Sequence, residues 1–364
     1  MKKISIVFSV LLIAIFCWSC TKQVTSFVPV ATPFYYPGNY NFTNVNDSNQ
    51  KKVLLQIDSL MAAINAGNTQ GVPVDTTNLK RIFNSTSAVG YSLASLSIPA
   101  AQTDILNYFD SIGLFSHSVV NGSDGTAGVG ASTLQAGVSY LQSDSGYVYS
   151  QISNAVLMEG LIAYQMETNY LYDSVNTSID TTIMQRTWDA AFGYFGVPIN
   201  FPTDTTGSKY WGQYATTLST PLGLDNTIMT NFLIGRAAIN NNYIIASSFV
   251  PNTTSYAAIS DADNIIAAMD KLAGGAAIYE LGQAQTNDSL HDDVVARAHL
   301  SASWGFIHSL NYNISKARTN NTAQINAILA AYGTDLYRFN YSYHNVDSIK
   351  TVIGNMYGFT NTNF

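Results

Sequence analysis

Carboxylates and imidazoles are the side chains of this sequence that could act as general acids or bases. Glu159, Glu280 and His299 each fall within an apolar stretch of helical pattern, where burial would shift the pKa. Brought together from distant helices, these groups could form a catalytic dyad. We favour the other interpretation, in which they are structural polar groups with satisfied hydrogen bonds.

The local motifs of metal and nucleophilic chemistry are missing from the sequence. The three glutamates and five histidines never form His-Glu-x-x-His or Glu-x-x-His, so neither a zinc-protease helix nor a di-iron bundle is encoded locally. A Gly-x-Ser-x-Gly nucleophile elbow is also missing. We therefore expect no metal site, no cofactor and no catalytic residue, and we lean towards a protein that is not an enzyme.

Arg236 lies among apolar residues of a predicted helix and needs a partner if it is buried. Asp189 or Glu280 would serve, and a structural ion pair is favoured over a ligand clamp. Trp188, four and seven residues before two phenylalanines, belongs to a helical stripe typical of a core.

The segment 197–212 is aromatic and irregular, and it is a credible lip for a ligand pocket. Its aromatic side chains could stack on a sugar ring or a porphyrin, and the sequence does not choose between the two. The candidate ligand-binding residues are Trp188, Asp189, Tyr194, Tyr210, Trp211, Arg236, Glu280 and His299.

Both cysteines of the chain, Cys17 and Cys20, lie in the opening stretch MKKISIVFSVLLIAIFCWSC. Two lysines precede an apolar run of the length of a signal-peptide core, too short to span a bilayer as a helix. Ser19 followed by Cys20 resembles the lipobox of bacterial lipoproteins. That resemblance implies a signal peptide over 1–19, acylation of Cys20, a bilayer anchor through it and a tether over 20–49. An ordinary secretory signal with accidental cysteines is the alternative.

Composition favours an extracytoplasmic protein. Charged residues make up 11% of the chain, against roughly 25% in an average globular protein. The formal net charge is −7, and no basic cluster follows Lys3, which excludes a typical nucleic-acid partner. Thr21 after the candidate lipidated cysteine, in place of the aspartate that retains lipoproteins at the inner membrane, favours the outer membrane.

Apolar periodicity predicts helices along most of the chain and no sheet. A short one carrying Leu79, Ile82 and Phe83 is expected with Asp75 as N-cap. The others are expected at 50–67, 99–112, 147–175, 182–196, 225–249 with Asp225 as N-cap, 255–285, 289–312, 322–331 and 345–357. The tether should begin to dock near Tyr40. The glycine-rich stretch 121–137 is expected to be a mobile surface loop, because it lacks the lysine and the preceding strand of a phosphate cradle. The fold class is therefore all-α: eight or nine helices in one or two bundles over 50–364.

Several segments, in order along the chain, resemble an imelysin-related lipoprotein family of unknown function from Gram-negative bacteria. They are YNFTNVNDSNQ (40–50), RTWDAAFGYFGVPINFP (186–202), KYWGQY (209–214), FLIGRAAI (232–239), HLSASWGFIHSL (299–310) and MYGF (356–359). The resemblance implies an imelysin-like helical fold, a lipid anchor and a role in iron or haem acquisition beside TonB-dependent receptors. Ala190 and Ala302 stand where relatives carry acidic residues, and the imelysin Gly-x-His-x-x-Glu is missing, so no metal role is carried over.

Two classes of function remain open. The first is a non-enzymatic binding or accessory lipoprotein of nutrient uptake at the outer membrane, with iron or haem ranked first by the resemblance. Its partner would be a TonB-dependent receptor or a companion lipoprotein, and capture of carbohydrate is a variant. The alternative is an envelope hydrolase, either peptidase-like or glycan-directed.

Asp followed by Ser or Thr and then an apolar residue or Thr occurs eight times. The pattern resembles the acceptor sequence of an O-glycosylation system for exported proteins. Thr181 and Thr205 are the best candidates, since most occurrences are predicted between helices, whereas Ser59 lies inside one and should stay unmodified. Helix caps and turns, which favour the same residue pairs, are the alternative explanation.

Overall fold

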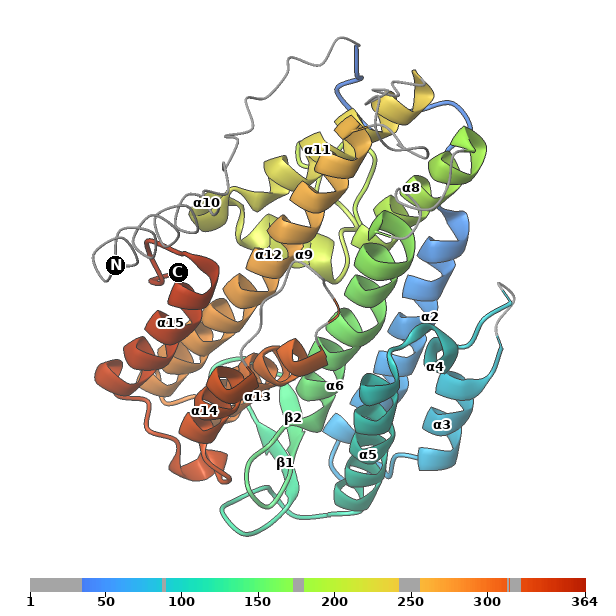
Figure 1. Ribbon diagram of the computed structural model, residues 1–364. Helices are drawn as coiled ribbons and strands as arrows, with labels where there is room; N and C mark the ends of the chain where they lie inside the picture. The colour runs from blue at the N-terminus through green and yellow to red at the C-terminus, as the bar shows by residue number, and fades with distance from the viewer. Residues whose placement is uncertain (1–34, 87–89, 173–179, 242–255, 313, 315–321) are drawn as a thin grey trace, which may run out of the picture. The chain divides into compact units, whose positions relative to one another are not determined.

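The computed structural model describes residues 35–86, 90–172, 180–241, 256–312, 314 and 322–364 (Figure 1). Contacts separate Met1–Pro33 from a second unit, Phe34–Phe364, to which all the described residues belong. The expected signal peptide, Cys20 and most of the expected tether lie outside the described residues. Within them the fold is mostly α-helical, which confirms the predicted class.

The described residues form thirteen α-helices, more than the eight or nine expected. Three of the additional helices have only one or two turns, too short to produce a clear apolar period. They are α4 (Leu93–Leu96), α9 (Trp211–Thr217) and α10 (Ser219–Leu222).

The first helices follow the predicted pattern closely. Helix α2 (Ser48–Asn65) buries its apolar stripe, and a short 3-10 turn, η1 (Ala66–Asn68), continues it. Asp75 caps α3 (Thr76–Asn84) by accepting from the backbone N–H groups of Thr77 at 2.9 Å and Asn78 at 3.2 Å. Helix α5 (Pro99–Ser116) begins with proline at its first position.

A long central helix runs through the middle of the bundle (Figure 1). It starts as α6 (Tyr149–Leu157) and continues as the π-helical η2 (Met158–Tyr172). Most of its residues are buried, and it packs against α5, α8, α12 and α13. The helix predicted over 147–175 is confirmed from Tyr149 to Tyr172, and the last three residues of the prediction lie outside the described part.

The remaining helices surround this one. They are α8 (Thr181–Phe195), α11 (Leu224–Asn240), α12 (Tyr256–Ser289), α13 (Asp293–Ser309), α14 (Thr322–Tyr332) and α15 (Tyr343–Tyr357), with 3-10 turns η3 (Leu310–Tyr312) and η4 (Leu336–Arg338). Helix α12 packs against α11, α13 and α15.

Asp225 is not the N-cap of α11. Gly223, with a φ of 61°, holds that position, and Asp225 is the second residue of the helix. Its carboxylate accepts a hydrogen bond from the Ser219 hydroxyl at 2.6 Å, which ties α10 to α11. Of the predicted helix 225–249, residues 242–249 lie outside the described part.

The expectation of no sheet is wrong at one place. Strands β1 (Gly128–Ala131) and β2 (Ser139–Gln142) pair antiparallel, with Val129 opposite Leu141 and both side chains buried. The glycines that suggested a loop are required by packing. A Cβ on Gly130 would lie 2.8 Å from Val294 Cγ2, and one on Gly128 would lie 2.1 Å from the carbonyl oxygen of Val120.

Among the described helices, none combines the length and the apolar character needed to cross a membrane.

Candidate functional site

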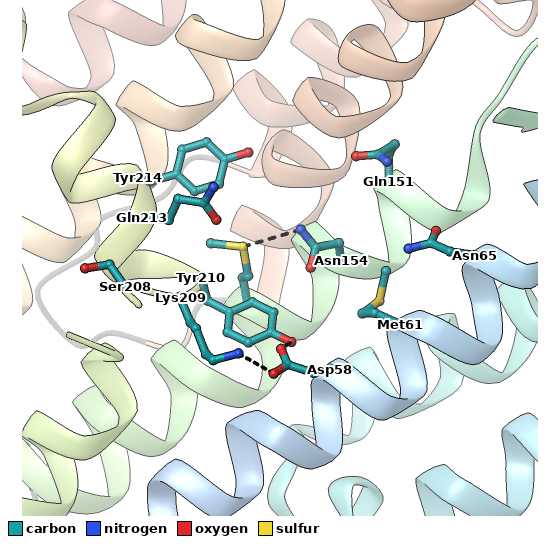
Figure 2. Close-up of a pocket in the computed structure, with 11 residues that line it drawn as sticks. Asp58, Met61, Asn65, Gln151, Asn154, Ser208, Lys209, Tyr210, Gln213 and Tyr214 are labelled. Carbon is teal, nitrogen blue, oxygen red and sulfur yellow. Dashed lines mark hydrogen bonds and ion pairs between the residues drawn. The ribbon is translucent and has the colours of Figure 1, made fainter. Parts of the chain in front are cut away.

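A cavity of about 400 Å³ lies at the end of the aromatic segment that was expected to form a pocket lip. Tyr210, from this segment, lines it, and Gln213 and Tyr214 follow on α9 (Figure 2). The facing walls come from α2, α6 and the start of η2, which contributes Met158. We refer to it below as the Tyr210 cavity.

Two helices present polar side chains to this cavity. Helix α2 contributes Asp58, Met61 and Asn65, and α6 contributes Gln151 and Asn154 (Figure 2). The α2 residues recur at three- and four-residue spacing, so they form one stripe beside the apolar face. That stripe is the sequence signal by which the α2 wall could have been found, but none of these three residues was among the predicted ligand-binding residues.

Backbone contacts hold the 197–212 segment in place. Helix α8 ends at Phe195, and its C-cap Gly196 turns the chain with a φ of 77°. The Lys209 N–H donates to the Gly196 carbonyl at 2.8 Å. Trp211 was expected to form part of the lip, but it is fully buried below it. Its indole Nε1–H donates to the Met158 carbonyl at 2.8 Å, so it anchors α9 to the central helix.

Asp58 is the polar centre of the Tyr210 cavity. The Tyr210 hydroxyl donates to Asp58 Oδ1 at 2.8 Å, and the Lys209 ammonium forms an ion pair with Asp58 Oδ2. Figure 2 shows both side chains directed at this carboxylate. Burial, and next the hydrogen bond to Asp58, raise the pKa of Tyr210 well above its usual value, so its phenol stays protonated.

Glu280 and His299, predicted as members of a possible dyad, do come together. His299 Nδ1 lies 2.6 Å from Glu280 Oε2, and the Tyr214 hydroxyl donates to Glu280 Oε1 at 2.6 Å. Burial and the Glu280 charge raise the pKa of Tyr214 far above its usual value. Tyr214 also lines the Tyr210 cavity, so it connects the cavity wall to the carboxylate–imidazole pair.

Glu159, the third predicted member, lies elsewhere in the core. It is fully buried on η2. Burial and the hydrogen bond to Asp104 are the main causes that raise the pKa of Tyr312, and Glu159 adds the smallest contribution. It is not among the residues that line the Tyr210 cavity.

Arg236 pairs with Asp189, one of the two partners expected from the sequence. The guanidinium Nε donates to Asp189 Oδ1 at 2.8 Å, and both side chains have no exposed surface. The carboxylate also accepts from the Tyr40 hydroxyl at 2.8 Å and from the Asn46 N–H at 3.0 Å. The pair therefore fastens the segment before α2 to helices α8 and α11.

Trp188 and Tyr194 are core residues and do not line the cavity, because both rings pack inside the bundle. The Trp188 Nε1–H donates to the Phe232 carbonyl at 3.0 Å, and Tyr194 stacks on Tyr170 with ring centroids 5.8 Å apart. Neither they nor the buried Asp189–Arg236 pair can meet a ligand held at Asp58. In the described part of the chain, no three His, Cys, Asp or Glu side chains gather as a metal site.

Thr205 lies exposed in an irregular loop, whereas Thr181 is half-buried as the first residue of α8. The expectation that most Asp-Ser/Thr occurrences lie between helices is corrected. Those at 58–60, 110–112 and 347–349 are inside helices, and those at 75–77 and 180–182 begin them. The occurrence at 173–175 lies outside the described residues.

Comparison with known proteins gives one match. The model of a family described as Domain of unknown function (DUF4856) matches residues 84–360. No curated protein and no solved structure shows a significant match to this chain. The matched region takes in α4 to α15 and every predicted ligand-binding residue. The chain therefore belongs to the DUF4856 family.

Proposed function

We propose that this protein is a lipid-anchored, non-enzymatic binding component of nutrient uptake at the outer membrane, and that its ligand occupies the Tyr210 cavity. The observation that carries the proposal is the cavity itself. Its volume of about 400 Å³ falls within the range of roughly 300–1,000 Å³ typical of small-molecule sites. The lipobox-like Ser19-Cys20 and the resemblance to imelysin-related lipoproteins support the anchor and the uptake role.

Iron and haem, ranked first by that resemblance, match this lining poorly. Asp58 is the one carboxylate of the lining, and Lys209 already neutralises it. Tyr210 keeps its proton, so it does not offer the phenolate that ferric iron would need. The lining residues include no imidazole. A small organic solute suits this cavity better.

A hydrolase is the second candidate, favoured by the Glu280–His299 pair. An imidazole 2.6 Å from a buried carboxylate is an arrangement used for general acid–base catalysis. Neither residue of the pair is among those that line the cavity, and Tyr214 links Glu280 to it, which supports binding over turnover. Ligand recovered unchanged after incubation with the protein would agree with binding, and recovered product would favour the hydrolase.

The anchor and the partner are tested together in intact cells. We expect the wild-type protein to incorporate radiolabelled palmitate and to crosslink to an outer-membrane receptor or a companion lipoprotein. The Cys20→Ala variant should lose the label completely, because Cys20 is the proposed acylated residue, and it should lose most of the crosslinked product. Ser19→Ala, which keeps a small residue before the cysteine, is the matched control and should retain both.

Palmitate entering the Cys20→Ala protein would contradict the anchor. A wild-type protein that carries lipid but yields no envelope partner would contradict the uptake role alone.

We further propose that Thr205 carries an O-linked glycan in a host that has such a system. Thr205 is exposed, and the Asp204 carboxylate before it accepts from the Thr206 N–H at 2.9 Å in a tight turn that a transferase can reach. Intact-mass spectrometry of protein from native envelopes should show a glycan mass, and Thr205→Ala should remove one glycan. For Ser59→Ala, inside α2, the mass should change only by the oxygen atom that the substitution removes. A mass equal to polypeptide plus lipid would contradict this proposal.

A further inference from the structure

We infer that the Tyr210 cavity selects a neutral, polyhydroxylated ligand, which makes a sugar its substrate class. The inference rests on the proposed function, in that it takes the cavity to be a binding site. It comes from three properties of the lining: its charge balance, its amide groups and its two tyrosine rings.

The charges of the lining cancel. Asp58 and Lys209 form an ion pair, and the Tyr210 hydroxyl adds a hydrogen bond at 2.8 Å to the same carboxylate. Their side chains are comparably exposed, 37% for Asp58 and 39% for Lys209. A charged ligand would lose hydration on entry without meeting an unpaired opposite charge, which disfavours it. A neutral ligand avoids that cost.

Four carboxamides line the same cavity: Asn65, Gln151, Asn154 and Gln213. Each carboxamide carries both donors and an acceptor, which matches the double role of a sugar hydroxyl. Within the described part of the chain, the Gln151 and Gln213 side chains make no hydrogen bond, so their groups are available to a ligand. Figure 2 shows Gln151 and Asn65 on the helices that face Tyr210.

Asp58 and Tyr210 make the cavity prefer ligands that donate hydrogen bonds. The Tyr210 proton is committed to Asp58, so the phenol oxygen meets a ligand as an acceptor. The Asp58 oxygens accept as well. Hydroxyl groups supply the donors that these oxygens accept, whereas a carboxylate or an ionised phosphate has no such donor to offer.

The two tyrosines supply apolar surface beside these polar groups. Tyr210 and Tyr214 both line the cavity, and each ring is held by the hydrogen bond of its hydroxyl to a carboxylate, Asp58 or Glu280. Ring faces fixed in this way suit the C–H faces of a pyranose.

A zwitterion is the main competing ligand, since its two charges could separate Asp58 from Lys209. That exchange breaks the ion pair and the Tyr210 hydrogen bond together before new contacts form. Free amino acids therefore belong among the probes as the alternative outcome.

Calorimetric titration of the full-length protein in detergent tests the inference. The probes are glucose, galactose, mannose, xylose, maltose and cellobiose, against glucuronate, free amino acids and haem. We expect at least one neutral sugar to bind, and Asp58→Asn to weaken it by about tenfold or more, since hydrogen bonds to charged groups are the stronger ones.

Matched variants separate the site from the fold. Asp110 on α5 forms an exposed ion pair with Lys80 on α3 at 2.6 Å. Asp110→Asn therefore removes an equivalent ion pair outside the cavity, and it should leave ligand binding unchanged. Gln213→Ala, at an exposed position of the lining, should weaken binding without affecting the thermal midpoint.

The outcomes distinguish this inference from the proposed function. Binding of a charged probe or haem, weakened by Gln213→Ala while no neutral sugar binds, would overturn the sugar assignment and leave the binding role intact. No binding by any probe at millimolar concentration would overturn both.

Discussion

Replacing Arg236 with methionine should lower the free energy of unfolding by about 3–5 kcal/mol, because the buried Asp189 carboxylate would lose its counter-charge. Neither side chain has exposed surface, so water cannot take the place of the guanidinium. The hydrogen bonds from Tyr40 and Asn46 would remain, and they are too few to compensate a buried charge. Denaturant unfolding followed by tryptophan fluorescence measures the loss, since the buried Trp188 is the residue before Asp189.

The control for this prediction is an exposed pair of the same kind. Lys80→Met, which removes the partner of Asp110, should cost less than about 1 kcal/mol, as exposed ion pairs usually do. Combining Asp189→Leu with Arg236→Met should restore part of the loss, because no buried charge then remains. Equal losses for the buried and the exposed pair would contradict the prediction.

This part of the core could be predicted from the sequence, because a charged residue buried among apolar residues needs a partner of opposite charge. Arg236 in an apolar helix required an acidic partner, and Asp189 was one of two named. Trp188 with Phe192 and Phe195 formed a stripe at helical spacing, and all three are buried. Such features depend on local periodicity and on the cost of burying a charge, both of which are visible without coordinates.

The hairpin was not predictable by the same means. Strand β1 is only four residues long, and two of them, Gly128 and Gly130, are glycines with low intrinsic strand preference. Their lack of a side chain is what lets Val294 and the Val120 carbonyl approach. A glycine required by a distant neighbour looks the same in the sequence as one required by a turn.

In the candidate site too, some residues could be predicted from the sequence and others could not. The lip was located from the aromatic segment before α9, and Tyr210 does line a cavity. The sequence did not show that Tyr210 lines the cavity while the adjacent Trp211 is buried. That difference depends on where helix α9 begins, which the sequence pattern did not reveal. Asp58 was missed because its partner Lys209 lies 151 residues away, and within α2 an acidic residue next to the apolar face suggests only solvent.

Replacing Asp261 with asparagine should stabilise the protein at neutral and alkaline pH. Asp261 on α12 is 7% exposed, and its Oδ2 has no hydrogen-bond partner within the described part of the chain. Burial raises the pKa of this carboxyl from 3.8 to about 7. The gap corresponds to roughly 4 kcal/mol at about 1.36 kcal/mol per pH unit, which is the largest stabilisation we expect.

The pH range follows from the raised pKa. Between pH 4 and about 7 the folded chain keeps a proton that the unfolded chain has lost, so the free energy of unfolding falls as pH rises and is level above that range. Asparagine resembles the protonated form at every pH and removes this slope. Denaturant titrations from pH 4.5 to 8.5 should show the two proteins closest at the acid end and furthest apart near pH 8. Burial also raises the pKa of Asp263, which is more exposed and lies two residues later, so Asp263→Asn is the comparison and should remove a smaller part of the slope. Parallel profiles for Asp261→Asn and wild type would show that the Asp261 carboxylate is solvated in the folded protein.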